Sequence, residues 1–336
     1  MTALSLGDLA HTFLLRRQSA QIKQDLTRLT EELASGRTTD TRTHLNGHFA
    51  ALAEFERELV LLDRYANTAA EVGTQSAAMQ SALGTVQDRA GALAETMALA
   101  SAGASPGDRR TVSSQAESEL KSIIAALNTR VAGRAIFGGT AVSDTPLADA
   151  DTILSQLRAA VAGATTAADV MAAADTFFDA TGGVFETSIY QGGTTDLSPF
   201  ELGAGEQVTL ALRADGGAMR GVLKSVAIAA LADDPGLALD DGEARDLLQT
   251  LSSETFSGQD EITRLRATLG FAEERIEAAA ARITSELTSV EVARNALLEV
   301  DPFQTATELE SVQVQLETLY TITARSSRLS LVNFLS

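Results

Sequence analysis

The chain contains no cysteine and no tryptophan, and aromatic residues make up only 4% of its 336 residues. Without cysteine it can form neither disulfides nor thiolate metal sites. Its apolar fraction is nevertheless 45%, and most of these residues are Ala, Leu and Val. Such residues suit close helix packing better than the lining of a large ligand cavity. We therefore expect a helical protein that binds no cofactor.

Basic residues are also few. The chain has 26 Lys and Arg against 45 Asp and Glu, which gives a formal net charge of −19. Nucleic acids and anionic membranes are bound through Lys and Arg patches, so the composition argues against both as partners. No stretch reaches the roughly 18 apolar residues of a transmembrane helix, and the N-terminus lacks the pattern of a cleaved signal peptide. We expect neither a membrane span nor a cleaved signal.

The sequence contains no recognisable motif for catalysis or metal binding. His44 and His48 are spaced to share one face of a helix, with Asp40 nearby, but the only other histidine is His11. A metal site needs further ligands. The many carboxylates have no His, Cys or basic residue placed to tune them, and the Gly-Gly pairs match no phosphate-binding loop. We predict a protein that is not an enzyme, with no catalytic, cofactor-binding or metal site.

Proline is rare, and the five prolines separate long runs with heptad-like apolar spacing. The first run, residues 12–34, has a narrow apolar seam that stops at Ser35-Gly36, before a polar connector at 36–43. The last run, residues 304–335, has a similar seam and an apolar tail. Such narrow seams cannot form a self-sufficient domain, so we predict that they pack between molecules. The predicted assembly interface consists of Ile22, Leu26, Leu29, Leu33, Leu309, Val312, Leu316, Leu319, Leu331 and Phe334.

Two much longer helices are expected between these ends, at residues 45–100 and 241–299. The first would be about 84 Å long at a rise of 1.5 Å per residue. Shorter helices are expected at 109–131, with Asp108 as the N-cap, and at 218–232.

The middle of the chain, residues 140–214, has a different pattern. Two short Ala-rich helices are expected at 151–162 and 166–180. Alternating apolar residues between Gly-Gly pairs predict strands beyond them. These strands are expected at 186–190, 196–202 and 206–214.

The order of elements is nearly symmetrical about this middle segment, which suggests that the chain doubles back on itself. The predicted fold class is mainly α: an elongated rod of long antiparallel coiled-coil helices from both termini, with a small inserted α+β segment. The predicted domains are a terminal assembly core of residues 1–44 plus 300–336, a long-helix rod of 45–139 plus 215–299, and an inserted mixed α/β domain at 140–214.

Three stretches resemble the flagellin superfamily, in which paired terminal helices form the inner core of a bacterial flagellum. Residues 26–37, LTRLTEELASGR, resemble the family's N-terminal helix with its Leu-x-Ser-Gly-Lys/Arg ending, and residues 133–139, GRAIFGG, resemble the segment that closes the N-terminal helical half. Residues 301–335 resemble the C-terminal helix, and their Leu-Ser-Leu-Val-Asn-Phe-Leu ending is closest to the hook-associated protein of the hook–filament junction. Two features depart from the family: residues 38–45 lack proline, and Ala135 replaces the usual aromatic residue.

The resemblance implies a structural adaptor that joins the flagellar hook, through another hook-associated protein, to the flagellin filament by helical self-assembly of its termini. Its partners would be copies of itself in a ring, the neighbouring hook-associated protein, flagellin and an export chaperone. It also implies an extracellular location reached by flagellar type III export. Two alternatives stay open: a filament flagellin, and a coiled-coil scaffold protein of the cytoplasm.

Overall fold

The computed structural model describes residues 4–103 and 105–335, and the side chains of residues 10, 13–103 and 105–325. The described residues form mainly helices, with two small two-stranded sheets. This confirms the predicted fold class: mainly α, with long helices and a small mixed segment.

The chain divides into two compact units. Unit 1 comprises residues 1–63 and 285–336, and unit 2 comprises residues 64–284. The two longest helices, α3 (Phe49–Ser101) and α8 (Asp241–Leu298), have residues in both units.

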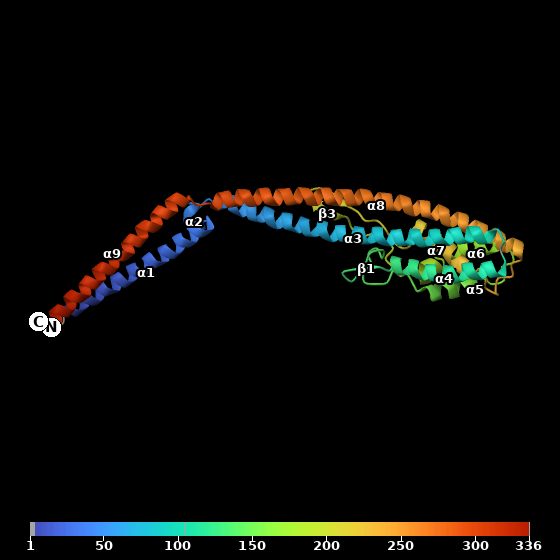
Figure 1. The fold of residues 1–336 in the computed structure, drawn as a ribbon, viewed down its shortest axis with the longest axis horizontal. Helices are drawn as coiled ribbons and strands as arrows, with labels where there is room; N and C mark the ends of the chain where they lie inside the picture. Colours follow the sequence, from blue (N-terminus) through green and yellow to red (C-terminus); the bar gives the residue numbers. More distant parts are fainter. Residues whose placement is uncertain (1–3, 104, 336) are drawn as a thin grey trace. The chain divides into compact units, whose positions relative to one another are not determined.

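Unit 1 is built on an antiparallel pair of helices, α1 (Leu4–Ser35) and α9 (Pro302–Leu335), which lie side by side in Figure 1. α1 ends where predicted, because Gly36 takes a positive φ of 69°, a conformation that glycine adopts without steric cost. α9 begins after Asp301, whose carboxylate accepts hydrogen bonds from two amides of its first turn.

The connector between α1 and α3 contains a short helix, α2 (Thr41–His44), which was not predicted. It begins after Asp40, whose carboxylate accepts a hydrogen bond from an amide of the first turn at 3.2 Å. After α2, Asn46 takes a positive φ of 48°. The long helix predicted from residue 45 therefore begins at Phe49, because this left-handed turn interrupts it.

Unit 2 has its core between the long helices and two shorter ones, α4 (Pro106–Leu127) and α7 (Gly217–Ala230), which pack against each other. The heptad-spaced apolar residues of α3 are completely buried here, so this part of the predicted seam is the core of unit 2. They include Met79, Leu83, Val86, Leu93 and Met97.

α4 begins earlier than predicted, and its N-cap is Ser105 rather than Asp108. The Ser105 hydroxyl accepts a hydrogen bond from the Asp108 amide at 3.2 Å, and the Asp108 carboxylate accepts one from the Ser105 amide at 3.1 Å. This reciprocal pair is a capping box, with Pro106 at the first helical position. The Ser-x-x-Asp spacing is visible in the sequence and would have predicted this start.

The middle segment contains the two expected short helices, α5 (Ala150–Val161) and α6 (Ala167–Asp179). The strands of unit 2 pair as two antiparallel hairpins, one just before the middle segment and one within it, where Phe200 lies opposite Val208. These strands are β1 (Arg130–Val131), β2 (Arg134–Ala135), β3 (Phe200–Gly203) and β4 (Glu206–Val208).

The strand predicted at 186–190 is wrong. Phe185–Ile189 is a single π-helical turn, η1. Phe185 and Ile189 are spaced by four residues and both are buried, and the Phe185 ring lies 5.5 Å from that of Phe178 in α6. Because Phe185 and Ile189 are buried at a helical spacing, and not at the alternate positions of a strand, this segment forms a helical turn. The strand predicted at 206–214 stops at Val208, since the Ala214 amide donates to the Phe137 carbonyl at 3.0 Å instead.

The Gly-Gly pair that ends the GRAIFGG stretch forms a close backbone crossing with the middle segment. The Gly193 amide donates to the Gly138 carbonyl at 2.8 Å. A Cβ on Gly139 would lie 2.5 Å from the Thr195 carbonyl oxygen, and Gly139 has a positive φ of 55°. The crossing therefore requires glycine at this position.

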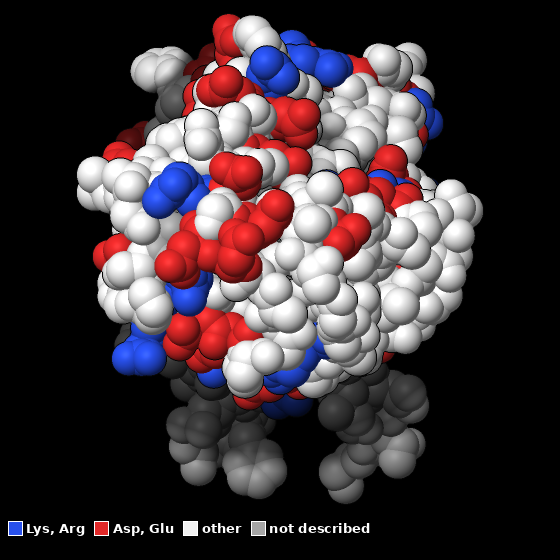
Figure 2. Space-filling view, turned by 90° about the vertical axis from the view of Figure 1, so that its right-hand side faces the viewer, with Lys and Arg blue, Asp and Glu red and all other residues white. Residues whose placement is uncertain are grey.

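Acidic side chains outnumber basic ones on the face of unit 2 drawn in Figure 2, where α8 begins. Some of the acidic residues are paired, because Arg109 lies 2.9 Å from Asp241 and Arg110 lies 3.4 Å from Asp233. Such exposed pairs contribute little stability each.

None of the described helices has an apolar stretch of the length that crossing a membrane requires.

Candidate assembly surface of unit 1

The apolar seams of α1 and α9 meet each other within one molecule. Ile22 and Leu29 of α1 and Leu319 of α9 are all buried. Ile22 and Leu319 also line a groove of about 270 Å³ between the two helices, with Val314 and Ile322. The pair is thus held by apolar burial but leaves space along its length.

The structure brings most of the predicted interface residues to this seam, with different degrees of burial. Leu26, Leu309, Val312 and Leu316 are half-buried, whereas Leu33 is 38% exposed. The side chains of Leu331 and Phe334 lie outside the described residues. That these residues also pack between molecules remains a prediction.

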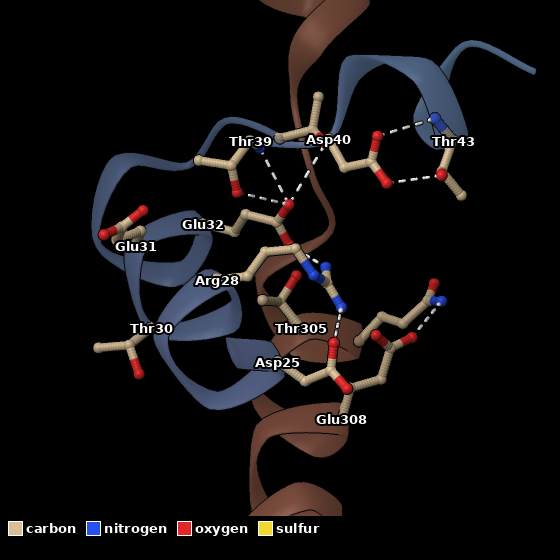
Figure 3. Close-up of polar contacts among 12 residues, drawn as sticks. Asp25, Arg28, Thr30, Glu31, Glu32, Thr39, Asp40, Thr43, Thr305 and Glu308 are labelled. Atoms are coloured by element: carbon tan, nitrogen blue, oxygen red, sulfur yellow. Dashed lines mark hydrogen bonds and ion pairs between the residues drawn. The ribbon is translucent and has the colours of Figure 1, made fainter. Parts of the chain in front are cut away.

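A buried carboxylate holds the connector against the end of α1. One oxygen of Glu32 accepts hydrogen bonds from the Thr39 amide and the Thr39 hydroxyl, both at 3.0 Å, and from the Thr38 hydroxyl at 3.3 Å. Its other oxygen lies 2.9 Å from the Arg28 guanidinium. Figure 3 shows Glu32 pointing from α1 towards the connector. We call Arg28, Glu32, Thr38 and Thr39 the connector clamp.

Glu32 is only 4% exposed, but its carboxylate has enough hydrogen-bond partners to stay charged. Burial alone would raise the pKa of Glu32. The hydrogen bonds from Thr39, with the nearby Arg28 and the Thr38 hydroxyl, outweigh that effect and hold the pKa below its ordinary value of 4.5.

Backbone pairing joins the two helix breaks of unit 1. Arg37 and Glu299 form an antiparallel bridge, in which the Thr38 amide donates to the Leu298 carbonyl at 2.9 Å. The Arg37 guanidinium also donates to the Asn295 side chain at 2.5 Å. The Ser35-Gly36-Arg37 sequence therefore has two roles. It ends α1, and its backbone and side-chain contacts hold the connector against the end of α8.

The connector clamp was not predicted from the sequence. Glu32 was overlooked because an acidic residue next to an apolar seam is ordinarily exposed. The signal was present, since two threonines follow the glycine turn and can reach back to the last turn of α1. Short hydroxyl side chains bind nearby carboxylates and backbone groups in this way.

The large exposed apolar side chains of unit 1, apart from Leu33, were not predicted either. Exposed apolar residues of this size, gathered in one region, mark interaction surfaces in many proteins. Most of the exposed large hydrophobic residues of the described chain belong to this unit. On α1 and α9 they are Phe13, Leu14, Leu33, Phe303, Val314, Tyr320 and Ile322, with Phe303 at 83% and Phe13 at 68% exposure.

The histidine pair does not have the geometry that its spacing predicted. α2 ends at His44, and the left-handed turn at Asn46 and Gly47 separates it from His48, so the two do not share one helical face. Among the described side chains, no group of three or more His, Cys, Asp and Glu could hold a metal ion.

Comparisons with known proteins match parts of the chain. Residues 257–335 match the bacterial flagellin C-terminal helical region, which here includes most of α8 and all of α9. No curated protein matches the chain in sequence.

Two solved structures are similar to the chain over 73% of its length. One is described as a flagellar hook-associated protein from Vibrio parahaemolyticus, with a TM-score of 0.50, 12% identity and 95% of that chain covered. The other is Bacillus cereus FlgL, with a TM-score of 0.49, 17% identity and 98% of that chain covered. The likeness to the Vibrio structure shows a shared fold. The family match at residues 257–335 confirms, for this region, the resemblance to flagellin that the C-terminal stretch at residues 301–335 predicted.

Proposed function

We propose that this chain is a non-enzymatic structural adaptor of the bacterial flagellum. It joins the hook, through another hook-associated protein, to the flagellin filament by helical self-assembly of its termini. The observation that carries the proposal is the flagellin C-terminal helical region at 257–335, whose α9 pairs with α1 in one unit.

The exposed side chains of unit 1 support the assembly role. α1 and α9 bury a narrow seam and leave large apolar residues such as Phe13 and Phe303 in solvent. An isolated pair of helices gains little stability from one narrow seam, and further packing would bury the outer residues. We infer that copies of the chain form a ring through these helices, between a hook-associated protein below and flagellin above.

Export to the outside of the cell belongs to the same proposal. The chain would pass unfolded through the flagellar export apparatus with the help of a dedicated chaperone. Exposed apolar side chains on terminal helices promote aggregation before assembly, which is the physical need that such a chaperone would meet. Cell fractionation would test the location, and recovery of the native chain only from the cytoplasm would support a cytoplasmic scaffold instead.

Deletion of the gene tests the adaptor role. We expect hooks without filaments by electron microscopy, with intact flagellin released into the medium, and restoration of filaments by the full chain. A strain that keeps its attached filaments after the deletion would contradict the proposal.

A filament flagellin is the second candidate, because the matched C-terminal region is described as that of flagellin itself. The same deletion separates the two functions. Loss of a filament subunit leaves bare hooks and removes the filament protein from the medium, whereas loss of an adaptor leaves bare hooks and increases it.

A further inference from the structure

The outer sides of α1 and α9 carry opposite charge. On the described part of α1, Arg16, Arg17 and Lys23 are all exposed. On α9, Glu310 and Glu317 are exposed, and neither has a Lys or Arg as a sequence neighbour. The basic strip is unusual in a chain with a net charge of −19.

Helical geometry places these charges away from the seam that joins the two helices. A residue advances about 100° around an α-helix, so Glu310 and Glu317 lie roughly opposite the buried Leu319. By the same rule, Arg16 and Lys23 share one flank of α1, to the side of the buried Ile22. The Lys23 ammonium accordingly lies at the edge of the pair, 6.0 Å from the ring centre of Tyr320.

The two strips have the same spacing. Arg16 and Lys23 are one heptad apart, and so are Glu310 and Glu317, which corresponds to about 10.5 Å along a helix. Two helices placed side by side in antiparallel orientation can therefore form both ion pairs at once. Among the described residues, the structure records no ion pair for any of these four side chains.

We propose that the basic flank of α1 in one copy of the chain packs against the acidic outer face of α9 in the next copy, with Lys23 facing Glu310 and Arg16 facing Glu317. The inference rests on the proposed self-assembly and names the faces that meet. Charge complementarity selects a second copy as the occupant, because each copy carries both strips.

The charges set the arrangement, and the apolar residues beside them supply contact area. Two α9 outer faces would repel each other, so the α1-to-α9 contact is favoured over a contact between like faces. Val314, which is 61% exposed, stands between Glu310 and Glu317 along the helix. Exposed ion pairs alone contribute little affinity, but a contact repeated around a ring multiplies a small preference.

A charge exchange in the full-length chain tests the contact in cells that lack the native gene. One variant carries Arg16→Glu and Lys23→Glu, a second carries Glu310→Lys and Glu317→Lys, and a third carries all four changes. The third has the same net charge as the native chain, so it controls for solubility and export. Circular dichroism and the amount of chain exported are measured for every variant.

Each double variant should fold and be exported normally, yet leave about tenfold fewer attached filaments, since repulsion replaces attraction at both pairs. The fourfold variant should restore most of them. Equal filament numbers in all variants, or a fourfold variant as impaired as the double ones, would overturn the inference; the latter would mean that the strips face unlike partners. The proposed function itself fails separately, if filaments stay attached when the gene is absent.

Discussion

Replacing Glu32 should loosen the connector without disturbing the rest of the chain. Glu32→Ala removes the acceptor of three hydrogen bonds from Thr38 and Thr39, together with the ion pair to Arg28. Hydrogen bonds to a charged group contribute more than neutral ones, but Thr39 is exposed and water can replace part of what is lost. Arg28 is also partly exposed, which weakens its pairing. We expect a local loss of about 2–3 kcal/mol.

Amide hydrogen exchange at Thr39 measures this loss, because a connector opens locally without unfolding its unit. A change of 2–3 kcal/mol corresponds to roughly 30- to 140-fold faster exchange. Glu32→Gln should have a smaller effect of about 1 kcal/mol, since its amide oxygen can keep the threonine bonds and only the charge is lost. Circular dichroism should remain unchanged in both variants.

The matched control is Glu31→Gln, which removes the same charge from the exposed neighbouring position on α1. It should leave exchange at Thr39 unchanged. If Glu32→Ala accelerated Thr39 no more than Glu31→Gln does, the connector would be held by its backbone pairing, and the role assigned to the clamp would be wrong.

Four further predictions concern Glu32 again and three positions of unit 2. Folding lowers the pKa of Glu32, so its stabilising effect is complete above the ordinary value of 4.5 and is lost as the pH falls through the folded value. Below the folded pKa, the native chain and Glu32→Gln should have the same protection from amide exchange at Thr39. A difference in protection that persists at low pH would contradict this. Gly139→Ala should lower the stability of unit 2 by about 2–3 kcal/mol in thermal melts, because its Cβ would meet the Thr195 carbonyl at a positive φ. In the same melts, Gly221→Ala should raise the stability of unit 2 by about 0.5–1 kcal/mol. Gly221 lies within α7, where alanine is the better helix former, and an added Cβ would meet no atom within 4 Å. Ser105→Ala should cost about 1 kcal/mol through loss of the cap of α4, and an unchanged melting temperature would show that the capping box is dispensable.

Much of the helical part of this fold could be predicted from local sequence. The narrow seams and the rarity of proline predicted the long helices, and Ser35-Gly36 and Asp301-Pro302 predicted where the terminal helices end and begin. These signals act over a few residues, because glycine, proline and capping side chains act on the backbone next to them. The start of α4 was also encoded locally, by Ser105 and Asp108, although the cap was assigned to the wrong member of the pair.

The middle segment was less predictable, because long-range contacts decide it. The apolar residues of 185–190 fit either a strand or a helical turn, and packing of Phe185 against Phe178 selects the helical turn. The close crossing at Gly139 depends on residues more than fifty positions away in the chain, such as Thr195. No local pattern reveals such a contact.

By itself, the sequence determined the long helices, the breaks at Ser35-Gly36 and Asp301-Pro302, and the family that the C-terminal part resembles, since periodicity and caps are local properties. The tertiary structure decided how the terminal seams are used. It turns Ile22, Leu29 and Leu319 inward against each other, and leaves Phe13 and Phe303 outside. A seam identifies an apolar face but not its partner, because a helix of the same chain and a helix of another copy bury that face by the same physics.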